Sequence, residues 1–325
     1  MVLKGLQQMI IYQSIAEVRG KLRHPVATIG NFDGVHLGHR EIFKRVRELA
    51  KKAGGVSVVV TFAPHPLQVL APERGVKLIT SPREKAALIE ASGIDYLLEI
   101  PFDAAFAALS AGEFVERVLV GTLGIEHLVI GYDYAFGKGR EGDVTLLREL
   151  GGRFGYTVEL LPAVANGDTV YSSTKVRELV TRGDVKGVVE VLGRHYFISG
   201  TVVHGQHRGR GLGFPTANLE TDDDLLPEVG VYAVKVRIGT ELYDGACNIG
   251  SNPTFQNERV TLEVFLFNFD GDLYGKEVSV FFLDRLRGER RFPSLDELKA
   301  AIAADVARCR EILKDAAIVE YHDAE

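Results

Sequence analysis

Apolar and polar residues follow two different patterns along the chain, and the pattern changes after Gly193. Before it, short apolar runs alternate with stretches that have the period of amphipathic helices. The apolar runs predict strands at Val26–Ile29, Val56–Phe62, Tyr96–Ile100, His127–Ile130 and Thr157–Leu161. The amphipathic stretches predict helices at Arg40–Ala53, Pro82–Ala91, Ala111–Leu119 and Val144–Leu150.

Buried strands that alternate with helices are typical of a parallel sheet covered on both faces. Such sheets bind ligands where helix N-termini meet the carboxyl ends of strands. Two further helices are expected at Ser172–Arg182 and Val185–Leu192, because Gly183-Asp184 between them offers a helix stop and a new N-cap. The first part of the chain is therefore expected to be an α/β domain that ends in a helical linker.

After Gly193 the chain is rich in β-branched and aromatic residues, with turn-forming residues between the runs. This pattern predicts a closed antiparallel barrel. Its strands are expected at Thr201–Val203, Gly230–Ile238, Leu242–Ile249, Val260–Phe269 and Val278–Leu283, followed by a helix at Leu295–Lys314 that Ser294 caps. The boundary is expected in the linker near Lys186–Arg194, which gives domains of residues 1–186 and 187–325.

The composition narrows the class of protein. A length of 325 residues, with 46% hydrophobic and 25% charged residues, is enough for two ordinary globular domains. The net charge of -6 gives no sign of a nucleic-acid or membrane partner, and we expect neither a signal peptide nor a membrane span. Cys247 and Cys309 form no disulfide framework or metal cluster pattern, so a reduced, cytoplasmic setting is expected.

The string Gly-Asn-Phe-Asp-Gly-Val-His-Leu-Gly-His at Gly30–His39 joins a predicted strand to a predicted helix. His36 and His39 are spaced to lie on one side of the first helical turn, beside free backbone N–H groups that attract phosphate. Gly30 and Gly34 let the backbone approach a ligand closely. The string is neither a P-loop nor a Gly-x-Gly-x-x-Gly motif. It suits attack on an α-phosphate with pyrophosphate leaving, and the alternative is a tight turn with two exposed histidines.

Two further patterns in the first domain have structural alternatives. Ser172, Ser173 and Thr174 place hydroxyls at a helix start, and Arg177 follows one turn later, so the group could hold a phosphate. An ordinary Ser/Thr N-cap would explain the hydroxyls equally well. Thr61–Pro66 and Gly131–Gly137 each end a strand with aromatic residues, which could sandwich a planar ring or simply pack their loops.

A second phosphate-binding pattern lies in the β-rich part, at Gly200–Asn218. Its recurring glycines suit a flap that closes over phosphates, and the alternative is a glycine-rich hairpin without a ligand. Thr216 and Asn218, directly after the flap, supply the hard oxygen ligands that Mg²⁺ prefers. Glu263 interrupts an otherwise apolar strand and is a candidate general base for a substrate hydroxyl. By alternation alone, Glu263 would more readily be a solvent-facing strand residue.

The strings Gly30–His39, Thr61–Pro66, Gly131–Gly137 and Ser172–Arg177 resemble the adenylyltransferase half of the prokaryotic bifunctional riboflavin kinase/FMN adenylyltransferase family, also called FAD synthetases. The resemblance implies a Rossmann-like nucleotidyltransferase domain. It implies catalytic roles for His36 and His39 and an ATP site formed by Gly30, Asn31, Phe32, Asp33, Gly34, Ser172, Ser173, Thr174 and Arg177. It also implies a flavin site formed by Phe62, Pro64, His65, Asp133 and Phe136. Ala63 departs from the family, which commonly has an acidic residue there.

The second half resembles the riboflavin kinase half of the same family, in order and nearly end to end. The resembling strings are Gly200–Asn218, Asn248–Phe255, Glu263, Asp270–Gly275 and Leu286–Phe292. The resemblance implies a six-stranded barrel with a C-terminal helix, in which Glu263 activates the ribityl 5′-hydroxyl. It implies an ATP site of Gly205, Gly209, Arg210, Gly213, Pro215, Thr216 and Asn218, with Thr216 and Asn218 holding Mg²⁺. It implies a flavin site of Arg287, Glu289 and Phe292, while Phe265 and Asn268 depart from the frequent His and Asp.

The expected protein is therefore a bifunctional transferase of flavin biosynthesis. Its barrel would convert riboflavin and ATP to FMN and ADP, and its α/β domain would convert FMN and ATP to FAD and pyrophosphate. Both reactions would need Mg²⁺ and no permanently bound cofactor. One alternative is a kinase whose other half only binds nucleotide, and a second is a flavin-storage or flavin-sensing protein without turnover. FAD production from FMN would exclude the first, and ATP consumption would exclude the second.

Overall fold

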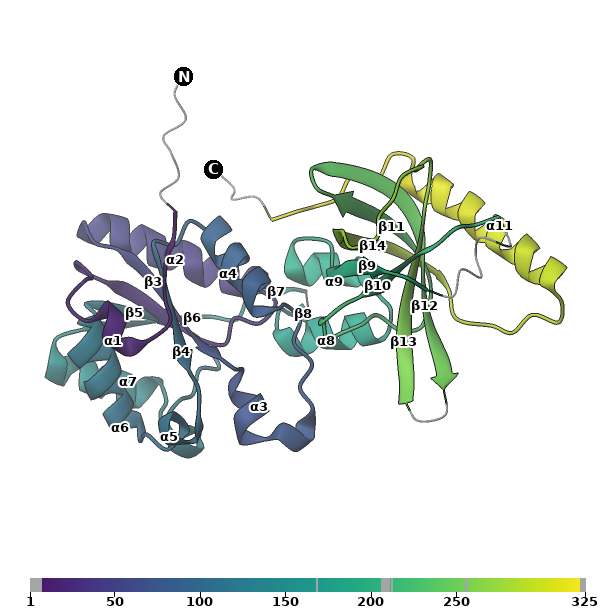
Figure 1. Cartoon of the computed structure of the whole chain (residues 1–325). Coiled ribbons are helices and arrows are strands. Elements are labelled where there is room, and N and C mark those ends of the chain that lie inside the picture. The colour runs from purple at the N-terminus through teal and green to yellow at the C-terminus, as the bar shows by residue number, and fades with distance from the viewer. Residues whose placement is uncertain (1–7, 168, 206–210, 212, 255–256, 322–325) are drawn as a thin grey trace, which may run out of the picture. The chain divides into compact units, whose positions relative to one another are not determined.

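The computed structural model describes residues 8–167, 169–205, 211, 213–254 and 257–321, with the backbone alone for those of residues 251–259 that it describes. The chain forms two compact units, Met1–Ser173 with Tyr321–Glu325, and Thr174–Glu320. The first unit contains a parallel sheet and the second a closed barrel (Figure 1). The predicted fold class, an α/β domain followed by a six-stranded antiparallel barrel and a C-terminal helix, is confirmed.

The sheet of the first unit is parallel throughout. Its order is β1 (Ile10–Tyr12), β4 (Tyr96–Pro101), β3 (Ser57–Ala63), β2 (Val26–Ile29), β5 (His127–Gly131) and β6 (Thr157–Leu161). Edge strand β1 was not predicted, because two of its three residues are exposed and it lacks the apolar run of the central strands. The central strands are buried on both faces, which is why they read as continuous apolar runs.

Helices cover both faces of this sheet (Figure 1). One face packs against α2 (Leu37–Ala53) and α4 (Pro82–Ala91). The other packs against α1 (Ile15–Val18), α6 (Ala111–Phe114), the π-helix η2 (Val115–Leu123) and α7 (Val144–Phe154). Short elements complete the unit: α3 (Pro66–Leu70), η1 (Pro72–Arg74), α5 (Ala104–Ala107), η3 (Lys138–Arg140), β7 (Ala165–Asn166) and β8 (Thr169–Val170).

Several helix limits differ from the sequence prediction. Helix α2 begins at Leu37 rather than Arg40, because the backbone N–H groups of His39 and Arg40 already donate to the carbonyl of His36. The segment predicted as one helix from Ala111 to Leu119 is α-helical only over Ala111–Phe114, and a π-helix follows over Val115–Leu123. The apolar period cannot distinguish these two helix types over so short a stretch.

The second unit opens with α8 (Ser173–Thr181, whose first residue belongs to the first unit) and α9 (Val185–Leu192). As predicted, Asp184 caps α9 by accepting a hydrogen bond from the N–H of Gly187 at 2.9 Å. The barrel order is β10 (Ala217–Glu220), β13 (Asn257–Leu266), β12 (Glu241–Thr254), β11 (Gly230–Ile238), β14 (Glu277–Arg287) and β9 (Phe197–Val203), closed by pairing of β9 with β10.

Helix α11 (Leu295–Leu313) lies against the outside of the barrel (Figure 1). Its cap is the predicted one, since Ser294 Oγ accepts from the N–H of Glu297 at 3.2 Å. Cys309 and Leu313 on this helix pack with Ala233 and Phe281 of the barrel. Strand β10 was not predicted, because its four residues follow the glycine-rich stretch and are too few to show alternation.

Candidate active sites

The loop Gly30–His36 lies where the chain order of the parallel sheet reverses. Strand β2 pairs with β3 on one side and with β5 on the other. The chain continues from β2 to β3 and β4 in one direction, and β5 and β6 are added in the other. Open α/β sheets bind ligands at the carboxyl ends of the strands at such a point. The topology therefore places the first predicted phosphate loop at the position where this fold forms its binding crevice.

The backbone of this loop is held in an unusual conformation. Phe32, Gly34 and Val35 have φ angles of 49°, 80° and 40°. A positive φ is strained for a β-branched residue such as Val35, and strain of this kind gathers at functional sites. A Cβ on Gly34 would lie 2.9 Å from the side chain of Ile79, so glycine is required there for two reasons. The conformation of the loop is therefore held by the residues packed around it.

Asp33 supplies much of that restraint. Its buried carboxylate accepts hydrogen bonds from the backbone N–H groups of Ile79 at 3.0 Å and Thr80 at 3.2 Å. The hydroxyl of Thr80 also donates to the Asp33 carboxylate at 3.4 Å, and the same hydroxyl accepts a hydrogen bond from the N–H of Gly34 at 3.2 Å. These bonds occupy the side chain of Asp33 with protein groups. A contribution of Asp33 and of the exposed Asn31 to ATP binding stays a prediction.

His36 and His39 stack on each other at the start of α2. Their ring centroids are 3.6 Å apart with an interplanar angle of 26°. His36 is the N-cap residue of α2, so both rings lie beside the first, unpaired N–H groups of the helix. The ring of Phe32 meets His39 edge-on at 5.1 Å and fixes its orientation from the buried side. The sequence prediction that the two imidazoles lie together is confirmed by this geometry.

Burial keeps His39 neutral. Desolvation, with a smaller contribution from the neighbouring His36, lowers the pKa of His39 well below its ordinary value of 6.5. Its Nδ1 atom is buried and has no hydrogen-bond partner among the described residues. A buried polar atom without a partner is costly, and at a binding site it marks a position that a ligand completes. A hydrogen bond from the neutral His39 to a substrate stays a prediction.

The predicted second phosphate clamp lies at the start of α8. The hydroxyl of Ser173 donates to the carbonyl of Asp33 at 2.9 Å, which ties this helix start to the phosphate loop. Ser172 precedes it, and Tyr171 approaches the same loop, with its carbonyl 3.6 Å from the Cβ position of Gly38. Thr174 and Arg177 follow on α8 and belong to the second unit. The role of these four clamp residues in binding phosphate stays a prediction.

The predicted flavin aromatics belong to a continuous aromatic cluster on one side of the sheet. Phe62 meets Phe102 at 5.5 Å and Phe106 at 6.0 Å. From Phe106 the ring contacts continue through Phe114 to Phe136, each at centroid distances of 5.7 or 6.0 Å. Phe62 is half-buried, whereas Phe136 is 7% exposed and sits in the core. The structure thus links the two predicted walls through rings that the sequence analysis did not single out.

The remaining predicted flavin residues lie in the loops after β3 and β5. The peptide bond between Ala63 and Pro64 is cis. His65 caps α3, because its Nδ1 accepts from the N–H of Leu67 at 3.2 Å. Asp133 is exposed in the loop after β5. Each stands at the carboxyl edge of the sheet, and none is shown to touch a ligand.

In the barrel, strand register brings the predicted kinase residues into one row. Glu263 on β13 lies opposite Asn218 on β10 and opposite Asn248 on β12. Directly opposed residues of antiparallel strands project to the same face. The hydroxyl of Thr216 donates to Glu263 Oε2 at 3.3 Å and joins the row. Glu263 is half-buried and alternates along β13 with the buried Leu262 and Val264, so it projects from the strand face opposite to these two residues, and its catalytic role stays a prediction.

The glycine-rich stretch approaches this row closely. A Cβ on Gly205 would lie 2.1 Å from Asn218 Nδ2, so any larger residue here would displace the Asn218 side chain or the backbone. Gly213 has a φ angle of 88°, and both Gly213 and Pro215 are exposed beside Thr216. Gly209 and Arg210, which were also predicted to bind ATP, lie outside the described residues.

The predicted kinase flavin residues follow β14. Arg287 pairs with Asp305 of α11 through bonds of 2.6 and 3.1 Å, and its guanidinium lies 5.6 Å from the ring of Phe292. Glu289 Oε1 lies 3.7 Å from the Cβ position of Gly250, close to the Glu263 row. Arg287 is therefore a link between the barrel and α11, and direct flavin contacts of all three residues stay predictions.

Three residues beside the sites were missed by the sequence analysis. Asn248 lies in a string that resembles the kinase half, but its place beside Glu263 becomes visible only through the strand register. Lys85 is buried on α4, with its ammonium at the end of β3. Its position could have been noticed, since it falls on the core-facing side of an amphipathic helix together with Leu88. Phe102 directly follows β4, as predicted site residues follow other strands.

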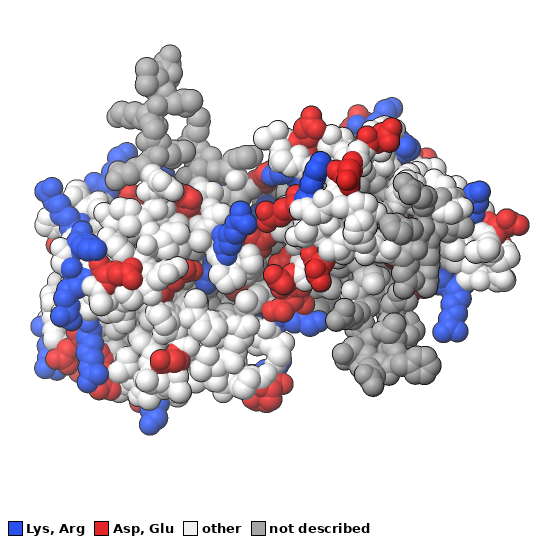
Figure 2. Space-filling model, in the orientation of Figure 1, with Lys and Arg blue, Asp and Glu red and all other residues white. Residues whose placement is uncertain are grey.

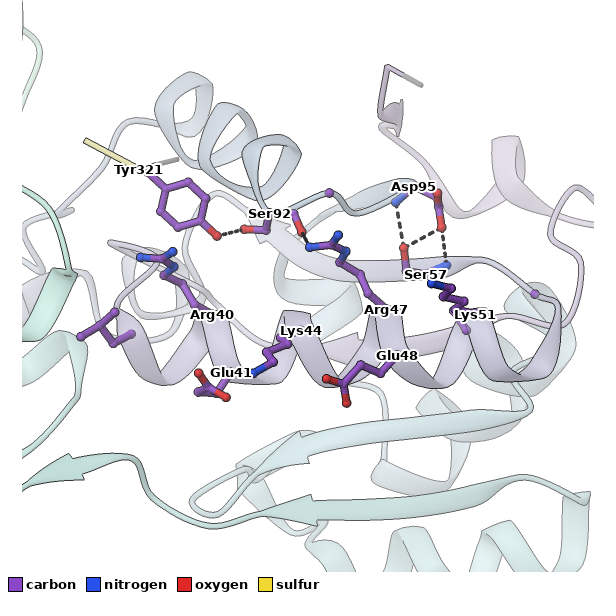
Figure 3. Close-up of a pocket in the computed structure, with 14 residues that line it drawn as sticks. Arg40, Glu41, Lys44, Arg47, Glu48, Lys51, Ser57, Ser92, Asp95 and Tyr321 are labelled. Carbon is purple, nitrogen blue, oxygen red and sulfur yellow. Dashed lines mark hydrogen bonds between the residues drawn. The ribbon is translucent and has the colours of Figure 1, made fainter. Parts of the chain in front are cut away.

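A separate hollow of about 700 Å³ lies along α2 (Figure 3). It is lined by basic and acidic side chains of α2 and, as Figure 3 shows, by Ser57, Ser92, Asp95 and Tyr321. Arg47 donates to the carbonyl of Ser92, Ser57 bonds Asp95, and Tyr321 bonds the hydroxyl of Ser92. None of the predicted site residues lines it, and we assign no substrate to it.

The charges and thiols of the described residues give no sign of another chemistry. Figure 2 shows basic and acidic side chains interspersed on the face that it draws, in accord with the net charge of -6. Cys247 and Cys309 are free and buried, and burial raises the pKa of Cys309 to about 12. Burial and the nearby Glu263 likewise raise the pKa of Cys247, so neither thiol is an activated nucleophile.

Comparison with known proteins identifies both halves. A family model described as FAD synthetase matches residues 19–175, and one described as riboflavin kinase matches residues 192–313. A protein of Pseudomonas fluorescens named bifunctional riboflavin kinase/FMN adenylyltransferase is 41% identical over 305 residues, which cover 94% of this chain and 98% of that protein. Proteins of the same name from Escherichia coli K12 and Bacillus subtilis are 41% and 38% identical over 88% and 86% of this chain, and over 92% and 90% of their own lengths.

A solved structure shows the same fold. The crystal structure named "Macrolide-efflux Protein from Streptococcus pneumoniae" is 32% identical, has a TM-score of 0.84, and the match covers 95% of this chain and 99% of that one. No helix among the described residues is long and apolar enough to span a membrane. With relatives of this identity matched over nearly their whole length, the chain belongs to the family of bifunctional riboflavin kinase/FMN adenylyltransferases.

Proposed function

We propose that this chain catalyses two consecutive reactions of flavin cofactor synthesis. The barrel unit transfers the γ-phosphoryl group of ATP to riboflavin and releases FMN and ADP. The parallel-sheet unit transfers the adenylyl group of ATP to FMN and releases FAD and pyrophosphate. Riboflavin, FMN, FAD and ATP are thus its substrates and products. The observation that carries the proposal is the presence of two separate built sites, the stacked histidines at the β2 switch point and the Thr216–Glu263 row.

In the adenylyltransferase site, the residues act by positioning and by stabilising charge. An oxygen of the FMN phosphate forms a bond to the α-phosphorus of ATP. The bond from that phosphorus to the bridging oxygen breaks, and pyrophosphate leaves with the electron pair. His36, the neutral His39 and the N-terminus of α2 donate hydrogen bonds to the charged phosphate oxygens. Ser172, Ser173, Thr174 and Arg177 are proposed to hold the remaining charge.

In the kinase site, Glu263 is proposed as the general base. The ribityl 5′-hydroxyl attacks the γ-phosphorus of ATP, its proton passes to the Glu263 carboxylate, and ADP leaves with the bond electrons. The hydrogen bond from Thr216 holds one carboxylate oxygen at 3.3 Å and leaves the other available for the substrate hydroxyl. A positioned base of this kind usually contributes about 10²–10⁴-fold to the rate.

The donor set beside Glu263 suits a magnesium ion. Thr216 and Asn218 offer neutral oxygen atoms, and Thr216 can donate to Glu263 while its lone pairs remain free. Mg²⁺ prefers such hard oxygens together with phosphate and water. When bound with ATP, the ion would neutralise phosphate charge. We propose Thr216 and Asn218 as its protein ligands, and removal of Mg²⁺ with a chelator should stop both reactions.

We also propose that the functional boundary lies between residues 186 and 187, and that the enzyme works in the cytoplasm. The family matches end at residue 175 and resume at residue 192, which supports a boundary in that interval. A chain that starts at residue 187 lacks the first two residues of α9, which begins at Val185. The boundary is therefore tested by comparing this chain with one that starts at residue 174 and keeps the whole helix. Both should be folded by circular dichroism and should make FMN. A folded 187–325 chain without kinase activity would contradict the boundary.

The proposed function is tested by incubating the full chain with riboflavin, ATP and Mg²⁺. Chromatography should show FMN rising first and FAD following, with ADP and pyrophosphate as the other products. Accumulation of FMN without FAD would contradict the second activity. Flavin binding without ATP consumption would contradict both activities and would favour a flavin-storage protein.

A further inference from the structure

Lys85 is a buried cation that the proposed reaction does not yet use. It lies on α4 with 8% of its surface exposed. Lysine is rarely buried to this extent unless its ammonium is paired. Its Nζ donates to Thr61 Oγ1 at 3.1 Å and to the carbonyl oxygen of Phe62 at 3.3 Å. Both acceptors belong to the carboxyl end of β3, where the predicted flavin wall begins.

The hydrogen bonds continue from Lys85 into the phosphate loop. Thr61 Oγ1, which accepts from Lys85, donates to the carbonyl oxygen of Asn31 at 3.1 Å. Asn31 stands in the predicted ATP loop, one residue after Gly30. A single ammonium group therefore connects the segment predicted to bind phosphate with the segment predicted to bind flavin. The connection is short and contains only one intermediate hydroxyl.

The start of the same helix is bonded to the same loop. The carboxylate of Asp33 accepts from the N–H groups of Ile79 and Thr80, which directly precede the N-cap residue of α4. Asp33 and Lys85 thus fix the start of α4 to the site at two points, Thr80 just before the helix and Lys85 in its first turn. This bracing also explains how the positive φ angles of Phe32 and Val35 are maintained.

The surrounding charges favour an ammonium at this position. Burial lowers the pKa of Lys85 from 10.5, while Glu99 and Asp33 act in the opposite direction. Glu99 on β4 lies in register with Thr61, so both project toward the same region. Glu99 Oε1 is buried and has no hydrogen-bond partner among the described residues. The charge of the ammonium is thus balanced through space by Glu99 on β4 and by Asp33 in the loop after β2.

We propose that Lys85 is a positioning residue for FMN adenylylation. It sets the spacing between the Asn31 loop and the Phe62 wall, so that the FMN phosphate meets the α-phosphorus of ATP in line. Lys85 forms no bond to substrate and transfers no proton. The inference rests on the proposed adenylyltransferase site and adds a residue to it. A small misplacement of reacting groups can cost about 10²-fold in rate.

The test compares Lys85→Met with Arg83→Met in the full chain. Met keeps most of the length of lysine but removes its charge and donors, and Arg83 is an exposed cation on the same helix. We expect Lys85→Met to lower kcat for FMN adenylylation about 10- to 100-fold, with smaller changes in KM. Arg83→Met should remain within about twofold, and riboflavin phosphorylation should be unchanged in both variants. Wild-type adenylylation kinetics in a folded Lys85→Met protein would overturn the inference.

Two further readouts separate positioning from a purely structural role. Thr61→Val removes only the linking hydroxyl, and the Lys85→Met/Thr61→Val double variant should be little worse than the poorer single variant, because both break one connection. The wild-type adenylylation rate should fall as the pH rises through the lowered pKa of Lys85, and Lys85→Met should lack this alkaline decline. Strictly additive losses with an unchanged pH profile would overturn the inference.

The same assay distinguishes failure of the inference from failure of the proposed function. If the wild-type chain makes no FAD from FMN, the adenylyltransferase proposal fails and the role of Lys85 fails with it. If wild type and Lys85→Met make FAD equally fast, only the role of Lys85 fails. If Lys85→Met unfolds, thermal melting will show it, and Thr61→Val then carries the test. A lowered adenylylation rate in folded Thr61→Val supports the inference, and a wild-type rate overturns it.

Discussion

The two sites of this protein are built in opposite ways. The adenylyltransferase site draws its phosphate loop and both histidines from one continuous segment, Gly30–His39, which a parallel strand places at the switch point of the sheet. The row proposed as the kinase site takes Asn218, Asn248 and Glu263 from three strands, and only the barrel register aligns them. A site formed by one continuous segment can therefore be predicted from the sequence, whereas a site assembled from several strands can be predicted only when the strand pairing is known.

The two sites also differ in how they are held. The phosphate loop carries backbone strain at Phe32 and Val35, and buried bonds of Asp33 maintain it. The kinase row relies on regular strand pairing and on the close approach of Gly205 to Asn218. Substitutions in the first site should thus disturb a braced loop, and those in the second should disturb single contacts in an otherwise regular barrel.

The largest effect is expected from Glu263→Gln, which should abolish the activity of the barrel site and leave that of the sheet site intact. We expect the rate of riboflavin phosphorylation to fall about 10²–10⁴-fold, because Gln keeps the shape of the side chain but cannot accept the hydroxyl proton. Steady-state assays with riboflavin and ATP measure this effect. The same protein supplied with FMN and ATP should release pyrophosphate at the wild-type rate. A kinase rate within a few-fold of wild type would make Glu263 an ordinary strand residue.

The matching test of the first site is His36→Ala and His39→Ala. Each variant should lose about 10²–10³-fold in FAD formation from FMN, since each loses a hydrogen-bond donor to the charged phosphates. FMN formation from riboflavin should persist in both. The measurement is FAD production by chromatography. Near-normal FAD synthesis in both variants would show that the stacked histidines have no part in the reaction.

A smaller effect is expected from Gly205→Ala. The new Cβ would lie 2.1 Å from Asn218 Nδ2, so the Asn218 side chain or the backbone at residue 205 must shift. We expect a rise of about tenfold in KM for ATP in the kinase reaction, because Asn218 is a proposed ligand of the magnesium–ATP complex. Gly152→Ala serves as the control, because the Cβ position of Gly152 has open space around it. Gly239→Ala would not serve, because the positive φ angle of Gly239 strains any other residue. Equal KM values in Gly205→Ala and wild type would contradict the placement of Asn218.

The smallest predicted effect concerns the pH dependence of stability. The folded-state pKa of His39 lies below 6.5, so between these two values the unfolded chain binds a proton at this imidazole and the folded chain does not. The free energy of unfolding therefore decreases as the pH falls through this window. His39→Asn removes this contribution, so its Tm should decline less than that of wild type between about pH 7 and pH 5. Parallel declines in Tm would indicate that His39 is not desolvated in the folded protein.

Most of the architecture could be predicted from the apolar pattern, because central strands of a covered sheet read as uninterrupted runs. Strand β2 and helices α4 and α9 have the predicted limits. Strands β1 and β10 were missed, since an exposed edge strand and a four-residue strand carry too little pattern. The apolar period predicted a helix over Ala111–Leu119 but could not reveal that it becomes a π-helix from Val115, because the period does not distinguish the two helix types over so short a stretch.

The site could be predicted where its residues are neighbours in the sequence. The stacking of His36 on His39 follows from their spacing at the start of α2. The bonds from Lys85 to β3 could not be foreseen, because they join segments 24 residues apart through the packing of α4 on the sheet. Alternation places Glu263 on the less buried face of its strand, as the structure does, but only the strand register and the bond from Thr216 show which polar residues lie beside it there.

The central claim, that one chain carries two independent sites for consecutive reactions, is tested most directly by mixing two variants. Glu263→Gln should convert FMN but not riboflavin, and His39→Ala should convert riboflavin to FMN but stop there. Each variant alone, given riboflavin, ATP and Mg²⁺, should therefore make very little FAD. An equimolar mixture should convert riboflavin to FAD, because FMN released by one variant is adenylylated by the other. Failure of the mixture to form FAD while added FMN is still converted, or loss of both activities in either variant, would contradict the claim.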